Sequence, residues 1–127
     1  MINKNGKVLL ADDDEDFLRT YHTILEKAGF QVLDATNGEE TLGIAMRERP
    51  DVLVLDVSIP KKDGLAVMKE MRTMGEDWAK NVPIIILTGK NLDDERIRAV
   101  ADWNPTYYLV KGNTSSSELI RKIESVV

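Results

Sequence analysis

The sequence predicts a single α/β domain built on a five-stranded parallel sheet with helices on both faces. Five short apolar runs recur along the chain, separated by amphipathic stretches with helical spacing. Continuous apolar runs of four residues are typical of strands buried on both faces, as in a parallel sheet. Five alternations of strand and helix favour an α/β sandwich with right-handed crossovers. The runs are residues 8–11, 30–33, 52–55, 84–87 and 107–110.

The stretches between and after these runs predict five helices. The first, 17–28, repeats apolar residues at helical spacing, and Gly29 follows it as a C-cap. Serines at 115–117 are N-cap candidates for the last helix. Residues 74–81 form the longest irregular connection and are expected to be a solvated loop. The other four helices are expected around 42–46, 65–72, 97–101 and 119–127.

Length and composition narrow the class of protein. The 127 residues suit one domain, 1–127, with enough buried surface for one core. The chain has no Cys and one His, His22, which excludes thiolate and His-rich metal sites. A net charge of −5 disfavours direct binding to nucleic acid. No apolar run reaches membrane-spanning length, so a cytoplasmic protein is expected, and the initiating Met1 favours an N-terminal position for the domain.

Polar residues stand directly after four of the five apolar runs. They are Asp12, Asp56, Thr88 and Lys111. The carboxyl ends of parallel strands share one edge of an open sheet, where ligands bind. These four side chains are therefore expected to converge, while Asp34, after the remaining run, is expected to lie outside the group.

The convergence would bring the carboxylates of Asp12, Asp13 and Asp56 close together. Two carboxylates about 4 Å apart repel by roughly 4 kcal/mol at an effective dielectric constant of about 20. An oxygen-only cluster without Cys or His favours a hard cation, and Mg²⁺ in particular. Lys111 adds positive charge and Thr88 adds a hydroxyl donor. A carboxylate surrounded in this way is suited to accepting a phosphoryl group.

Simpler roles compete with this interpretation. An Asp at a strand end commonly caps the next helix, which is the role expected for Asp14 and Asp34 and an alternative for Asp12 and Asp13. A lone Lys or Thr at such a position is more often solvated or capping than catalytic. Capping does not explain the Lys after the last strand, so the combination favours phosphoryl transfer.

The chain resembles the response-regulator receiver domain over nearly its whole length. The similarity is carried by V-L-L-A-D-D-D-E-D-F at 8–17, L-D-V-S-I-P-K-K-D-G at 55–64, P-I-I-I-L-T-G at 83–89 and Y-L-V-K at 108–111. Its most specific part is the D-x-x-x-P-x-x-D-G spacing that begins at Asp56. The resemblance implies a flavodoxin-like, doubly wound parallel sheet with strand order 2-1-3-4-5 and five helices.

The resemblance also assigns roles to individual residues. Asp56 is implied to be the phosphoacceptor, with Lys111 and Thr88 contacting the phosphoryl oxygens. Tyr108 matches an aromatic that turns inward when Thr88 moves, and a plain core aromatic is the alternative. Gly89, a small residue after Thr88, leaves the nucleophile accessible.

The resemblance implies Mg²⁺ as the cofactor. Asp13 and Asp56 are the implied direct ligands, together with the backbone carbonyl of Ser58. Asp12 is implied to act mostly through water.

The implied function is a switch in two-component signalling. A sensor histidine kinase or a histidine phosphotransfer protein would supply the phosphoryl group, and an unknown downstream protein would read the switch. The chain is expected to be no enzyme, since it would catalyse only its own phosphorylation and dephosphorylation. We expect no direct nucleic-acid or membrane partner, and either a monomer or a phosphorylation-linked dimer.

Three other classes of protein share some of these features. A haloacid-dehalogenase-type phosphatase also uses a strand-end Asp, but it needs a second Asp where this chain has Ser58. A flavodoxin-like cofactor binder would meet carboxylates where a flavin phosphate should sit. A phosphorylation-independent pseudo-receiver, acting as a binding module, is the main alternative, and the complete set of acidic pair, Asp, Thr and Lys disfavours it.

The chain departs from the family pattern around its last strand. Receivers usually have Pro after the Lys, often in a cis bond, whereas this chain has Gly112. A cis bond before a non-proline residue costs about 2.5–4 kcal/mol, so a trans Lys111–Gly112 bond is expected, with Lys111 still aimed at Asp56. Asn-Pro-Thr at 104–106 replaces the usual Gly-Ala-Asp. The output surface, formed by the fourth helix, fifth strand and fifth helix, is therefore expected to be unusual.

Overall fold

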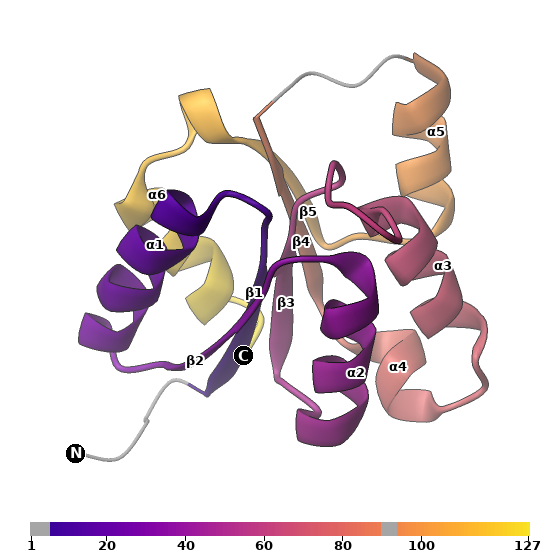
Figure 1. Ribbon diagram of the computed structural model, residues 1–127, viewed down its shortest axis with the longest axis horizontal. Helices are drawn as coiled ribbons and strands as arrows, with labels where there is room; N and C mark the ends of the chain where they lie inside the picture. The colour runs from indigo at the N-terminus through magenta and orange to yellow at the C-terminus, as the bar shows by residue number, and fades with distance from the viewer. Residues whose placement is uncertain (1–5, 90–93) are drawn as a thin grey trace.

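Five parallel strands form one sheet in a computed structural model that describes residues 6–89 and 94–127. The strand order is β2-β1-β3-β4-β5 (Figure 1), which confirms the predicted fold class and strand order. Each strand coincides with one of the predicted apolar runs to within two residues. The strands are β1 (Lys7–Ala11), β2 (Gln31–Ala35), β3 (Val52–Leu55), β4 (Ile84–Thr88) and β5 (Tyr107–Val110).

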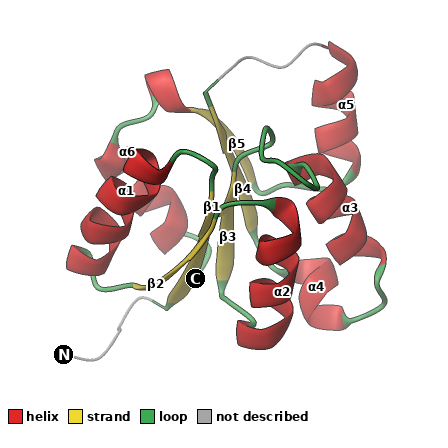
Figure 2. Cartoon of the chain, viewed as in Figure 1, coloured by secondary structure: helices red, strands yellow, loops and turns green. Residues whose placement is uncertain are grey.

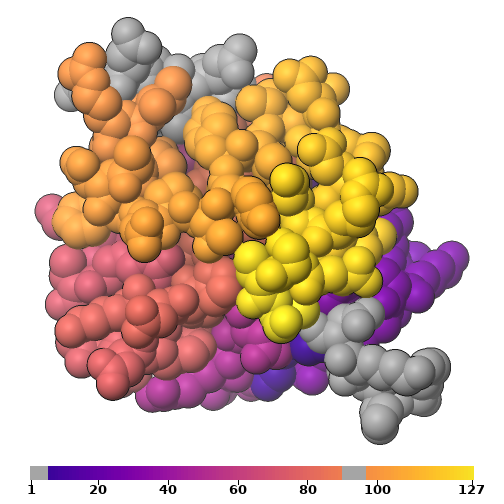
Figure 3. Space-filling view, turned by 180° about the vertical axis from the view of Figure 1, so that it is seen from behind, coloured from indigo at the N-terminus to yellow at the C-terminus, as the bar shows by residue number. Residues whose placement is uncertain are grey.

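Helices cover both faces of the sheet (Figure 2). On one face lie α1 (Glu15–Lys27) and α6 (Ser116–Glu124). On the other lie α2 (Gly38–Glu48), α3 (Gly64–Thr73), α4 (Asp77–Asn81) and α5 (Asp94–Asp102). A 3₁₀ turn, η1 (Lys111–Asn113), joins β5 to α6. The back of the molecule shows the C-terminal part of the chain, from α5 through β5 to α6, as one continuous surface (Figure 3).

The central strand β3 is apolar along its whole length because both sides of the sheet are covered. Leu9 and Leu53 pack in the cluster beneath α2 and α3, and Val8 and Val54 pack in the cluster beneath α1 and α6. Every residue of β3 and β4 is buried. Full burial of each such side chain stabilises the fold by about 1.5–3 kcal/mol, so the sheet provides a rigid base for its edge.

Two of the predicted helix caps are confirmed. The Asp14 side chain accepts hydrogen bonds from the N–H groups of Asp16 (3.0 Å) and Phe17 (3.1 Å) at the start of α1. The Ser115 hydroxyl accepts the N–H of Glu118 at 3.1 Å at the start of α6. Both caps satisfy N–H groups that have no partner within the helix.

Residues 74–81 are not the solvated loop that the sequence predicts. Asp77–Asn81 form helix α4, so the described chain has six α-helices where five were predicted. Ala79 is fully buried, and the Trp78 indole N–H donates to the carbonyl of Pro50 at 3.2 Å. A helix of five residues with one buried Ala is too short to show an apolar period, which is why the sequence pattern missed it.

Arg72 of α3 joins this added helix to the end of α5. Its guanidinium donates to the backbone carbonyls of Ala79 (2.9 Å), Trp103 (3.1 Å) and Asn104 (3.3 Å). Asn104 has a left-handed backbone conformation, with φ of 57°, which Asn tolerates better than most residues. The Asn-Pro-Thr departure thus forms a turn that is hydrogen-bonded to α3.

The prediction that Asp34 caps a helix is wrong. Asp34 lies inside β2, which continues two residues past the apolar run, and Asn37 caps α2 instead. The Asp34 carboxylate lies 2.9 Å from Nδ1 of His22, whose Nε2 lies 3.3 Å from Glu26. As predicted, Asp34 lies outside the group of strand-end residues described below.

Within the described ranges, no helix is long and apolar enough to cross a bilayer.

The His22 ion pairs should make stability depend on pH. Burial lowers the pKa of His22, but the hydrogen bonds and charges of Asp34 and Glu26 outweigh burial and raise this pKa above its ordinary value of 6.5. The stabilising contribution is therefore full below pH 6.5 and is lost as the pH rises through the raised pKa. Urea unfolding should give a wild-type free energy of unfolding about 0.5–1 kcal/mol above that of His22→Gln in mild acid.

The difference between the two proteins should shrink as the pH rises from neutral to alkaline. A difference that stays constant across this range would mean that the imidazolium charge does not stabilise the fold.

Candidate functional site

The pairing of the two central strands places Asp12 beside Asp56. Ala11 of β1 pairs with Leu55 of β3, and an Asp follows each of them. The N–H of Asp56 donates to the carbonyl of Ala11 at 3.0 Å, which extends the ladder one step beyond the strands. The backbone therefore holds both Asp residues at the carboxyl edge of the sheet, as predicted.

Thr88 and Lys111 reach the same edge from the next two strands. Thr88 is the last residue of β4 and pairs with Val110, the last residue of β5. Lys111 directly follows Val110, so it lies one residue further along than Thr88 at this edge of the sheet. Thr88 is buried, whereas Lys111 is partly exposed. The predicted four residues line one cavity of about 340 Å³, together with Asp13, Asp14, Ser58 and Gly89.

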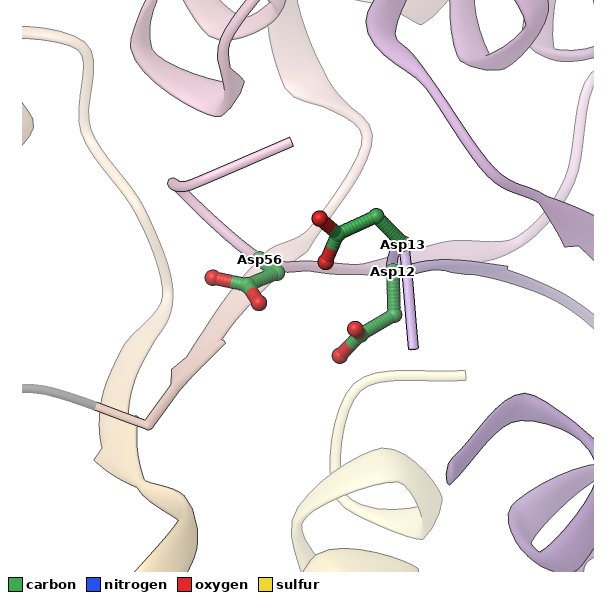
Figure 4. Close-up of side chains that lie close together, drawn as sticks. All are labelled: Asp12, Asp13 and Asp56. Carbon is green, nitrogen blue, oxygen red and sulfur yellow. The ribbon is translucent and has the colours of Figure 1, made fainter. Parts of the chain in front are cut away.

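Three of the residues that line this cavity bring their carboxylates close together. Figure 4 shows Asp12 and Asp13 projecting from the end of β1 and Asp56 from the end of β3. One oxygen of each lies within 4.8 Å of the others. Asp12 and Asp56 are buried, with side chains 2% and 8% exposed, while Asp13 is exposed. Like charges this close to one another favour a bound cation, and a set of oxygen ligands suits Mg²⁺.

The two buried carboxylates have fixed orientations. Oδ1 of Asp12 accepts the N–H of Asp14 at 2.9 Å, and Oδ1 of Asp56 accepts the N–H of Ser58 at 3.1 Å. Oδ2 of each faces Lys111, whose Nζ lies 2.5 Å from Asp12 and 3.5 Å from Asp56. The arrangement puts a cation directly against the carboxylate that is expected to react.

Burial and the charges of the cluster shift the pKa values of Lys111 and Asp12. Burial lowers the pKa of Lys111, but the hydrogen bond and charge of Asp12, followed by those of Asp56, raise it above its ordinary value. Lys111 is therefore an ammonium. Burial raises the pKa of Asp12 and the charge of Asp56 adds to that rise, while Lys111 opposes it. A divalent cation at the three carboxylates would offset both burial and repulsion.

A glycine brings the loop after β3 back against Asp56. The N–H of Gly64 donates to the carbonyl of Val57 at 2.9 Å, and a Cβ at Gly64 would lie 2.5 Å from the carbonyl oxygen of Asp56. Any larger residue would displace this backbone. Asp63 caps α3 by accepting an N–H of its first turn at 2.9 Å. The D-x-x-x-P-x-x-D-G motif thus forms a loop whose end packs against Asp56, the first residue of the motif.

The chain leaves β5 through a trans peptide bond. No peptide bond within the described ranges is cis, which confirms the prediction for Lys111–Gly112. Gly112 is exposed, and a Cβ there would have no neighbour within 4 Å. The Lys111 ammonium still lies beside Asp56, as predicted. Its direction is therefore set by β5 and by its own side-chain contacts, not by packing of the turn that follows.

Tyr108 and Phe17 are both partly buried and pack against the apolar clusters of the core. Tyr108 is not among the residues that line the cavity; it is half-buried and packs against the cluster beneath α2 and α3. Its switching role stays a prediction. Phe17, which the sequence pattern assigned to the core, also contacts the site: its ring centroid lies 4.1 Å from Nζ of Lys111. The only feature of the sequence that indicated this contact was the position of Phe17, three residues after the Asp14 cap.

Comparison with known proteins decides which family has this site. Residues 8–124 match the family model described as response regulator receiver domain. The chain belongs to the response regulator receiver domain family. The receiver is 38% identical over 93 residues to the alkaline phosphatase synthesis transcriptional regulatory protein PhoP of Bacillus subtilis (strain 168), a match that covers 73% of this chain and 37% of that protein.

Solved receiver structures share the fold. The Francisella response regulator 1452 receiver domain matches with a TM-score of 0.83 and 30% identity, over 96% of both chains. The receiver domain of the sensor histidine kinase PA1611 from Pseudomonas aeruginosa PAO1, which has a magnesium ion coordinated in its active site cleft, matches with a TM-score of 0.84 and 25% identity. That match covers 96% of this receiver and 97% of the other. The receiver spans about half, or less, of the length of the curated relatives it matches.

Mg²⁺ should stabilise the receiver by binding the three carboxylates. A ligand that binds only the native state raises stability by about 1.4 kcal/mol at roughly ten times its Kd. Calorimetric melting should therefore show a higher Tm in millimolar Mg²⁺. Asp13→Asn should remove most of this rise, and in metal-free buffer it should raise the Tm by relieving repulsion.

Asp16→Asn is the matched control, because Asp16 is an exposed carboxylate of the same segment that does not line the cavity. It should keep the full Mg²⁺ effect. An equal rise in wild type and Asp13→Asn would place the cation elsewhere.

Proposed function

We propose that this receiver accepts a phosphoryl group on Asp56 in a Mg²⁺-dependent reaction and thereby switches a protein-interaction surface. The supporting observation is the placement of the Lys111 ammonium 3.5 Å from the buried Asp56 carboxylate, in a cavity that Thr88 also lines. Phosphoryl transfer depends on positioning the nucleophile and on positive charge around the phosphoryl oxygens. Gly89 is an exposed residue that lines the cavity, and its lack of a side chain leaves Asp56 accessible to a donor.

The proposed step begins with a phosphohistidine on a sensor histidine kinase or a histidine phosphotransfer protein. A carboxylate oxygen of Asp56 attacks the phosphorus, and a P–O bond forms as the P–N bond breaks. The electron pair of that bond leaves with the ring nitrogen, which takes up a proton from solvent. Lys111 and Thr88 contact the phosphoryl oxygens. Later attack of water on the phosphorus releases phosphate and restores the carboxylate.

Mg²⁺ would supply neutralising charge at the phosphoryl oxygens when bound. Its proposed direct ligands are Asp13, Asp56 and the backbone carbonyl of Ser58, with Asp12 acting mostly through water. The oxygen-only cluster supports this proposal, as does the Mg²⁺ in the active site cleft of the PA1611 receiver domain. Asp12 already binds Lys111 at 2.5 Å, which fits an indirect role towards the metal.

The proposed output is a change in the surface formed by α5, β5 and α6 (Figure 3). Thr88 moves towards the phosphoryl group, and Tyr108 turns inward and shifts the balance between two forms of that surface. An unidentified downstream protein reads this shift. In this proposal the receiver is cytoplasmic, is no enzyme towards other molecules, and does not bind nucleic acid directly, which its net charge of −5 disfavours.

Phosphorylation at Asp56 can be tested with acetyl phosphate as donor. Wild type with Mg²⁺ should gain one phosphoryl group, detected as a mass adduct of the intact protein and as a shifted band in Phos-tag electrophoresis. Asp56→Asn should abolish the adduct, because the amide oxygen is a far weaker nucleophile than the carboxylate. Omission of Mg²⁺ should slow adduct formation at least about tenfold.

Asp34→Asn provides a control, since Asp34 is a carboxylate near the same sheet edge but outside the cavity. It should form the adduct normally. A full adduct on Asp56→Asn would refute the assignment, and no adduct on wild type would favour a phosphorylation-independent binding module.

A further inference from the structure

The Lys111 ammonium has an aromatic neighbour in addition to its two carboxylates. The ring centroid of Phe17 lies 4.1 Å from Nζ, inside the distance of about 6 Å at which a ring face attracts a cation. Phe17 comes from α1 and Lys111 follows β5, so the contact joins segments at opposite ends of the chain.

The Phe17 ring is itself held in place. It stacks on Tyr21, one turn further along α1, with ring centroids 4.3 Å apart and an interplanar angle of 17°. It also packs against the apolar cluster beneath α1 and α6. A ring supported by a helical neighbour and by the core presents its face to Lys111 in a defined position.

The backbone after Lys111 gives its side chain little support. Gly112 and Asn113 are exposed, and Gly112 has open space around it. Within the described part of the chain, the ammonium contacts Asp12, Asp56 and the Phe17 ring. Lysine is a point charge on a flexible four-carbon stem, so these three contacts decide where the charge lies.

The three contacts are not equivalent. Asp12 holds the ammonium at 2.5 Å and Asp56 at 3.5 Å, so the carboxylates alone favour a position on Asp12. A carboxylate oxygen binds a cation at a point, whereas a ring face attracts it over a broad area through the quadrupole of the ring. The ammonium can therefore move from Asp12 towards a phosphoryl oxygen on Asp56 without leaving the ring.

We propose that Phe17 is a positioning residue that keeps the Lys111 ammonium within reach of the phosphoryl group on Asp56. The ring does not contact the reacting atoms and acts only through Lys111. This inference rests on the proposed phosphorylation of Asp56.

Phe17→Leu removes the ring and keeps an apolar side chain, while Phe17→Tyr keeps the ring and is the matched control. The maximal rate of phosphorylation by acetyl phosphate should fall about 3- to 10-fold in Phe17→Leu. The acetyl phosphate concentration that gives half the maximal rate should stay unchanged. Phe17→Tyr should retain a rate within about twofold of wild type. Phe17→Ile is a second ringless variant if Phe17→Leu folds poorly.

A double-mutant cycle separates positioning from general packing. In a Lys111→Ala background, Phe17→Leu should cause no further loss of rate, because the effect of the ring passes through the ammonium. The Mg²⁺-induced rise in Tm should be the same in Phe17→Leu and wild type, since the carboxylates are untouched.

Equal maximal rates in wild type and Phe17→Leu would overturn the inference, as would an equal loss with and without Lys111. Those results would leave phosphorylation of Asp56 standing. A wild-type protein that gains no phosphoryl group from acetyl phosphate would overturn both proposals together.

Discussion

The in-register pairing of β1 with β3 is the constraint on which this molecule's chemistry depends. It brings the buried carboxylates of Asp12 and Asp56 to adjacent strand ends, with Asp13 beside them. Carboxylates about 4 Å apart repel by several kcal/mol at protein-like dielectric constants. The burial that stabilises the sheet therefore creates a site that requires positive charge. The fold provides part of that charge as Lys111 and leaves a set of oxygen ligands suited to a divalent cation.

The position of Lys111 shows how a departure from the family sequence is accommodated. Gly112 stands where receivers usually have Pro, and the chain continues through a trans bond and a 3₁₀ turn. The ammonium nevertheless lies between Asp12 and Asp56, because β5 sets the origin of the side chain and the surrounding groups hold its end. The Phe17 ring, supported by its stacking on Tyr21, is one of those groups.

The turn at Asn104, the second departure, is hydrogen-bonded to α3 through Arg72. The Arg72 guanidinium donates to carbonyls in α4, at the end of α5, and in the turn at Asn104. Burial lowers the pKa of Arg72. These hydrogen bonds of its guanidinium go to backbone carbonyls rather than to a carboxylate. A charged group bound in this way ties three segments to α3, which directly follows the loop around Asp56. The added α4 and the end of α5 are thus held by the same side chain.

The sequence by itself determined the five strands, the sheet edge and the convergence of Asp12, Asp56, Thr88 and Lys111. These follow from local patterns: an apolar run defines a strand buried on both faces, and parallel strands end at one edge. Only the tertiary structure revealed α4, the pairing of Asp34 with His22, and the ring of Phe17 against Lys111. The Trp78 indole N–H donates to the carbonyl of Pro50, 28 residues away, and the Asp34 carboxylate pairs with His22, 12 residues away. Apolar periodicity reports which side of an element is buried but not which partner covers it, so these three features were decided by the tertiary structure.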